Sequence, residues 1–91
     1  MGLQLKLNWF EKETEEFTGK EYSQDLGDDV SVIERLDLSV EEDINNGEFE
    51  VKQGFASVLQ PYFKHEIEIN KFDYFVAFNY QKNKWWIYKC H

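Results

Sequence analysis

The amino-terminal stretch LQLKLNWF, residues 3–10, alternates between apolar and polar side chains. Its odd positions are Leu or Trp, and its even positions as far as Asn8 are polar. A period of two predicts a β-strand with one buried side and one solvent-facing side. The same alternation places Phe10 on the solvent-facing side, where a phenyl ring requires an explanation.

Periodicity and turn residues predict the remaining elements. Gly27 interrupts the chain, and Asp28, Asp29 or Ser31 could cap the helix that follows. The first half of the chain is predicted to form a weaker strand at 14–23, a short helix at 32–36 and, after a turn at 45–47, a short strand at 48–52. The second half is predicted to form a helical turn at 55–63, with Pro61 near its end, and a hairpin. The two strands of this hairpin are 64–70 and 72–80, joined at Asn70-Lys71.

These predictions describe an α+β fold, mainly an antiparallel sheet of about four strands with one or two short helices. The 91 residues suit a single domain, 1–91, with one modest core. The tail, residues 81–91, is expected to be either an added edge strand or a surface extension.

Three phenylalanines, Phe10, Phe17 and Phe75, fall in rows of side chains that are otherwise polar and mainly acidic. Apolar rings surrounded by carboxylates indicate anchor residues inside the polar rim of a protein-binding patch. The alternative is that a helix or the tail, with Trp85 and Trp86, covers this face and makes the rings part of the core. The acids expected in these rows are Glu13, Glu15 and Glu21 beside Phe17, Glu66, Glu68 and Asp73 on the hairpin, and Glu48 and Glu50 on the short strand.

The net charge of −8 is concentrated in one part of the chain. Residues 11–50 contain fifteen Asp and Glu against three Lys and Arg, whereas residues 51–91 contain three against six. An acidic region of this kind disfavours nucleic acid as a partner and favours a basic protein. Solubility alone is the other explanation for the charge.

Composition predicts a folded, soluble, cytoplasmic protein without membrane contact. Hydrophobic residues make up 42% of the chain and aromatic residues 18%, which is more than a disordered acidic chain contains. The single cysteine, Cys90, cannot form an internal disulfide, and no apolar run reaches the length of a membrane helix. No basic-then-apolar signal follows Met1.

Candidate catalytic and metal-binding residues are few. Glu66 and Glu68 could be compared with the paired acids of a glycosidase, but acids two residues apart are common on solvated strands. His65, Cys90 and His91 lack any metal-ligand spacing. The sequence therefore predicts a protein that is not an enzyme and holds no metal or cofactor.

Five collinear segments carry a resemblance to a known family. MGLQLKLNWF, GKEYSQDLGDD, SVIERL, INNG and LQPYFKHEIEI with DYFVAFNY resemble the cloacin-type immunity proteins, antitoxins made with colicin-like bacteriocins that cut small-subunit ribosomal RNA. The resemblance extends from Met1 to about Tyr80. It implies a four-stranded antiparallel sheet whose open face binds the basic C-terminal ribonuclease domain of the toxin, with Phe10, Phe17 and Phe75 as anchors.

The chain also departs from the family pattern. Lys20 stands where an acid is found in at least one member, Val30 stands where glycine is familiar, and Glu48 holds a position that looks specificity-setting. These differences leave open which toxin is cognate. The residues expected to provide charge complementarity and specificity are Glu15, Lys20, Glu21, Glu48, Glu50, Glu66, Glu68 and Asp73.

The resulting hypothesis is a bacteriocin immunity protein that is a monomer or weak dimer when free. It would act in the cytoplasm and could leave the cell in complex with the toxin. Two other classes fit aromatic and acidic residues on a sheet, namely a carbohydrate-binding module and an acidic protein that mimics nucleic acid.

Overall fold

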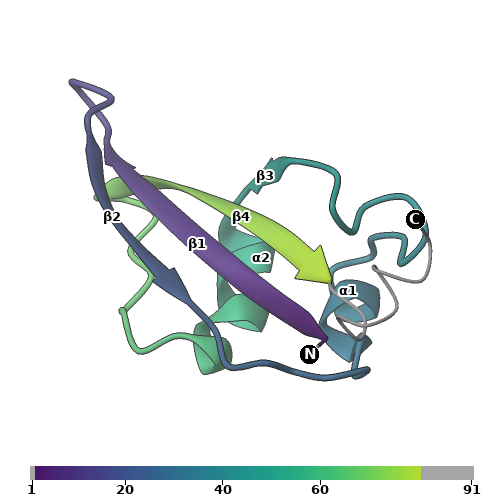
Figure 1. Cartoon of the computed structure of the whole chain (residues 1–91). Helices are drawn as coiled ribbons and strands as arrows, with labels where there is room; N and C mark the ends of the chain where they lie inside the picture. The colour runs from purple at the N-terminus through teal and green to yellow at the C-terminus, as the bar shows by residue number, and fades with distance from the viewer. Residues whose placement is uncertain (1, 81–91) are drawn as a thin grey trace, which may run out of the picture.

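An antiparallel sheet of four strands organises residues 2–80, which are the part of the chain that the computed structural model describes. The strands lie in the order β2-β1-β4-β3, so the two longest strands form the centre (Figure 1). The predicted α+β fold is confirmed. The elements are β1 (Leu3–Glu11), β2 (Phe17–Tyr22), α1 (Ser31–Arg35), β3 (Glu48–Glu50), α2 (Gln53–Leu59), the 3-10 helix η1 (Gln60–Tyr62) and β4 (Phe72–Tyr80).

One face of the sheet, here called the inner face, forms the core together with the helices. The alternating leucines of β1 are fully buried, and β4 adds Tyr74, Val76 and Phe78 from the neighbouring strand. Val32 and Ile33 of α1 and Leu59 of α2 pack into the same cluster. The opposite face, here called the outer face, carries the even-numbered residues of β1 and the odd-numbered residues of β4.

The short helices begin and end close to where the sequence predicts. The carboxylate of Asp29 accepts a hydrogen bond from the amide of Ser31 at 3.0 Å, at the start of α1. This bond is the main cause that lowers the pKa of the Asp29 carboxyl. Pro61 lies in η1, where the α-helix has already ended, which agrees with its expected place.

A bulge in β2 changes which side chains share a face. Trp9 pairs with Gly19, but the next residue of β1, Phe10, pairs with Phe17, so Thr18 is an extra residue. The expectation that Phe17 shares a row with Glu21 is therefore wrong. Phe17 lies on the outer face, whereas Glu21 pairs with Leu7 and belongs to the inner face.

The predicted strand at 64–70 is also wrong, because these residues form an irregular segment that leads into β4. The two sides of β4 are occupied by β1 and, over Phe75–Ala77, by β3. Side chains, instead of a neighbouring strand, accept hydrogen bonds from the backbone amides of the segment. Glu21 accepts from the amides of residues 64 and 65 at 2.8 and 2.9 Å, and the Gln60 side chain accepts from the amide of Ile67 at 2.8 Å.

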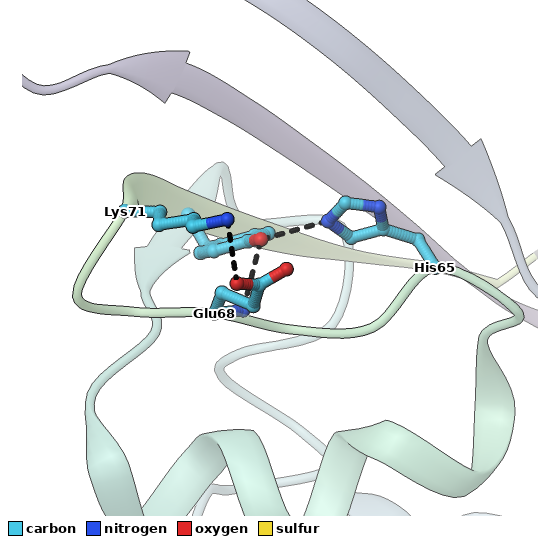
Figure 2. A network of polar contacts seen from close by, with 4 residues as sticks. His65, Glu68 and Lys71 are labelled. Carbon is cyan, nitrogen blue, oxygen red and sulfur yellow. Dashed lines mark hydrogen bonds and ion pairs between the residues drawn. The ribbon is translucent and has the colours of Figure 1, made fainter.

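A polar network fixes this segment beneath the inner face (Figure 2). The buried hydroxyl of Tyr74 accepts from the amide of Glu68 at 3.0 Å and is hydrogen-bonded to Nε2 of His65 at 2.7 Å. Burial raises the pKa of the Tyr74 hydroxyl, and the nearby carboxylates of Glu68 and Glu66 add to that rise. The His65 ring in turn stacks on Trp9, with centroids 3.9 Å apart and planes 10° apart.

Candidate protein-binding face

The outer face is open over its aromatic part. Both α-helices lie behind the sheet as Figure 1 is drawn, on the side of the core cluster. Phe17 is 56% exposed and Tyr22 is 47% exposed, so no element among residues 2–80 covers them. The alternative that a helix buries the three phenylalanines is therefore wrong. Trp85, Trp86 and the rest of the tail lie outside the described residues.

Phe10, Phe17 and Phe75 form one aromatic cluster on this face. The ring of Phe10 lies at the centre, 5.6 Å from Phe17 and 5.8 Å from Phe75 between centroids. Both contacts are edge-to-face, with interplanar angles of 70° and 80°, which is a favoured geometry for aromatic pairs. The rings support each other sideways and still present apolar surface outward. They are therefore preorganised for contact with a partner.

Acidic residues border the cluster at the β1–β2 turn. Phe10, Glu15, Asp73 and Phe75 line a shallow hollow of about 250 Å³. Glu15 has a φ of 60°, a left-handed conformation that costs a residue with a β-carbon roughly 1–2 kcal/mol. The carboxylate of Asp73 pairs with the ammonium of Lys12 at 2.9 Å, so its charge is partly balanced within the chain.

Two more acids border the cluster from β3. Glu50 pairs with Phe75 across the strands, and Glu48 pairs with Ala77. The carboxylate of Glu48 accepts a hydrogen bond of 2.5 Å from the side-chain amide of Asn8, which is 6% exposed. This bond holds the Glu48 side chain over the sheet. Glu15, Glu48, Glu50 and Asp73 are called the acidic rim below.

Three of the predicted charge residues are not brought to this face. Glu21 points toward the inner side, where both of its carboxylate oxygens bind backbone amides. Glu66 and Glu68 lie in the irregular segment, where Glu68 pairs with Lys71 at 3.4 Å (Figure 2). The cause in each case is a local departure from strand geometry, first the bulge in β2 and then the loss of the strand at 64–70.

Two outer-face residues, Lys6 and Tyr22, were not predicted from the sequence as candidates for binding. In the register of the sheet Lys6 lies opposite Tyr22, and Lys20 lies opposite Asn8. The bulge places Tyr22 on the same face as Phe17 despite their odd spacing. Gly19 was the available signal, because a glycine inside a strand often marks a bulge.

Among residues 2–80 the structure shows no group of three or more His, Cys, Asp or Glu side chains placed to hold a metal ion. Cys90 and His91 lie outside the described residues. No helix in the described range is long and apolar enough to cross a membrane.

These features define a class of protein, a small acidic domain that offers an aromatic cluster on one open face of a sheet. The family model described as "Cloacin immunity protein" matches residues 2–81 of the 91-residue chain. The chain belongs to the cloacin immunity protein family, as its sequence resemblance predicted. Membership supports a role in bacteriocin immunity and implies a cognate cloacin toxin as the partner.

Proposed function

We propose that the protein binds and inhibits the basic, ribosomal-RNA-cleaving C-terminal domain of its cognate toxin through the outer face. The observation that carries this proposal is the cluster of Phe10, Phe17 and Phe75, packed edge-to-face on an open sheet and bordered by the acidic rim. An enzyme that binds RNA exposes cationic side chains, and these complement the rim.

The aromatic cluster provides most of the affinity. Each ring carries about 150–250 Å² of surface, and covering it fully contributes roughly 1.5–3 kcal/mol. The acidic rim contributes orientation and association rate more than affinity. Glu15 belongs to this rim although glycine would adopt its left-handed conformation more readily, which favours a function for its carboxylate.

Inhibition follows from bulk and charge placed beside the toxin's active site. A bound domain with a net charge of −8 repels the phosphates of the ribosomal RNA and blocks the approach of the ribosome. No residue of this chain has to enter the catalytic centre. The protein is a monomer or weak dimer when free, acts in the cytoplasm and leaves the cell in complex with the toxin.

The geometry of the cluster fits a protein partner better than a sugar. The rings of Phe10 and Phe75 meet at 80°, so they do not form the flat platform on which a sugar ring would stack. The outer face also carries Lys6 and Lys20 among its acids, which a mimic of the phosphate backbone would not need.

The test is truncation of the aromatic cluster. Phe17→Ala and Phe75→Ala are expected to weaken binding to a purified cloacin-type ribonuclease domain by about 2 kcal/mol or more, as at other hot spots. The binding constant is measured by calorimetry, and protection of ribosomes from cleavage is measured in parallel. Circular dichroism checks the fold, which should be unchanged because Phe17 is mostly exposed.

Val40→Ala is the matched control, since Val40 is also an exposed apolar residue but lies in a hollow with Asp28, Val30, Ile44 and Tyr80. It should leave binding unchanged. Equal affinities for wild type, Phe17→Ala and Phe75→Ala would contradict the proposal. Unfolding of Phe75→Ala would show instead that this ring is part of the core.

A further inference from the structure

Two lysines share one tyrosine ring at the β2 edge of the outer face. The ammonium groups of Lys6 and Lys20 each lie 5.9 Å from the centroid of the Tyr22 ring. Lys6 is the cross-strand partner of Tyr22, and Lys20 precedes Tyr22 by two residues on the same side of β2. Tyr22 is 47% exposed, Lys20 is exposed and Lys6 is half-buried, so the ring is open to a partner. These three residues are called the lysine corner.

The two ammonium groups have no carboxylate partner among residues 2–80. The ion pairs in that range join Lys12 to Asp73 and Lys71 to Glu68. Asn8, which lies opposite Lys20, donates its side-chain amide to Glu48 instead. A cation–π contact with an exposed ring is weak, so the Tyr22 ring leaves both ammonium groups able to bind a carboxylate.

A hollow of about 680 Å³ lies next to the lysine corner, and Tyr22 lines it together with Glu21, Ser23, Gln24 and residues 61–64. Neither Lys6 nor Lys20 lines this hollow, and the carboxylate of Glu21 within it is engaged by two backbone amides. The positive charge of the lysine corner therefore comes from Lys6 and Lys20 on the outer face.

We infer that the lysine corner receives an Asp or Glu side chain of the protein partner. The carboxylate would lie beside the Tyr22 ring, where it can bind the ammonium group of Lys6 or Lys20. Charge-assisted hydrogen bonds to these ammonium groups compensate the carboxylate for lost water. This inference rests on the proposed function, since it concerns the same face and the same partner.

The consequence is that recognition depends on both basic and acidic residues of the partner. A cognate toxin domain presents basic residues opposite the acidic rim and one acidic residue opposite the lysine corner. A domain that is basic over its whole contact surface meets Lys6 and Lys20 with like charge and is rejected. An RNA partner is disfavoured because the acidic rim and the lysine corner share the outer face, and the rim repels phosphate.

Charge reversal tests the lysine corner because the two explanations predict opposite signs. We would measure affinity for the cloacin-type ribonuclease domain that binds the wild-type protein most tightly in a panel. If a carboxylate lies at the corner, Lys20→Glu and Lys6→Glu weaken binding about tenfold or more, and Lys20→Gln has an intermediate effect. If the corner faces cations or solvent, the same reversals leave binding unchanged or strengthen it.

Lys52→Glu is the matched control. Lys52 is an exposed lysine at the start of α2 and does not belong to the lysine corner, and its reversal changes the net charge equally. It should leave the affinity nearly unchanged. Exposed acids of the ribonuclease domain are then changed to lysine one at a time. One of these changes is expected to restore about tenfold of the affinity lost in Lys20→Glu, without improving binding of wild type.

Each outcome decides the question. The inference is overturned if both reversed variants bind as tightly as wild type or more tightly. It is also overturned if no change on the toxin domain restores the affinity lost in Lys20→Glu. Binding of a single-stranded RNA oligomer that Lys20→Glu abolishes would assign the corner to RNA and overturn it also. If Phe17→Ala weakens binding while Lys20→Glu does not, only this inference fails. If the wild-type protein binds no domain of the panel, the proposed function fails with it.

Discussion

At position 19, the lack of a side chain determines how closely Trp9 can approach β2. A β-carbon built on Gly19 would lie 2.6 Å from Cζ2 and 2.7 Å from Cε2 of the Trp9 ring, closer than such atoms approach in proteins. Trp9 cannot simply rotate away, because its other contacts are the stacked ring of His65 and the tilted ring of Tyr74. Gly19 thus links the bulged edge of β2 to the packing of the inner face.

Gly19→Ala is therefore expected to reduce the free energy of unfolding by about 1–3 kcal/mol, the usual range for overpacking. Urea unfolding followed by far-ultraviolet circular dichroism measures the change. Gly54→Ala is the control, because a β-carbon at Gly54 would meet no atom within 4 Å and the residue lies in α2. That variant should be neutral or more stable by up to about 1 kcal/mol. Equal stability of Gly19→Ala and wild type would contradict the packing argument.

At the scale of elements, one carboxylate of β2 anchors the segment between η1 and β4. Glu21 accepts from the amides of Lys64 and His65, and this contact joins positions more than forty residues apart. The segment also supplies Ile67 and Ile69, which pack partly buried against the core. Its position beneath the sheet therefore depends on a long-range polar contact as well as on apolar burial.

Glu21→Ala is expected to reduce the free energy of unfolding by roughly 1.5–3 kcal/mol, since hydrogen bonds to a charged group are lost and two amides are left without them. Hydrogen exchange should show faster exchange of the amide protons of residues 64 and 65. Glu66→Ala removes the same charge from an exposed position of the segment and should leave both quantities almost unchanged. Similar behaviour of the two variants would show that Glu21 does not anchor the segment.

The same contacts explain what the sequence could and could not predict. The strands at 3–11 and 72–80 were predictable because every second residue enters one core, and this period is visible locally. Ile67 and Ile69 alternate with acids in the same way, yet their segment is irregular because its amides bond to Gln60, Glu21 and Tyr74. Hydrogen bonds from side chains to these amides, one of them from a residue more than forty positions away, leave no trace in the alternation of apolar and polar residues.

In the candidate site, too, some residues could be predicted from the local pattern and others could not. Phe10 and Phe75 were assigned to the open face by the correct alternation. Phe17 was assigned to that face from a row that included Glu21, and the two residues lie on opposite faces because Thr18 is an extra residue. The bulge also hid Tyr22, whose partnership with Lys6 depends on the register of two strands. Faces of regular strands can be predicted from sequence, whereas a bulge shifts every residue beyond it.

At the scale of the whole molecule, electrostatics act over two different ranges. The net charge of −8 comes mainly from residues 11–50, and many of these acids lie outside the outer face. They contribute a long-range field that attracts a basic domain at low salt. The acidic rim acts at contact distance, where screening is weaker. Salt concentration can separate the two contributions, since the Debye length shortens from about 30 Å at ~0.01 M to about 8 Å at ~0.15 M.

The rate of association with a cloacin-type ribonuclease domain should therefore fall by roughly tenfold or more between ~0.01 M and ~0.3 M salt, with a smaller change in the dissociation rate. Stopped-flow fluorescence measures both rates. Two double variants, each lacking two negative charges, then separate the long-range field of the molecule from the contact-range effect of the acidic rim. Glu15→Gln with Glu50→Gln alters the acidic rim, and Glu41→Gln with Glu42→Gln alters exposed acids between α1 and β3.

Both double variants should associate more slowly than wild type at ~0.01 M salt, because at that concentration the partner responds to the field of the whole molecule. At ~0.15 M only the rim variant should remain slower, since the other two acids are then screened from the partner's approach. An association rate independent of salt would rule out electrostatic steering altogether. If the two variants were equally slow at ~0.15 M, steering would be a property of net charge, and the acidic rim would have no separate role in recognising the toxin.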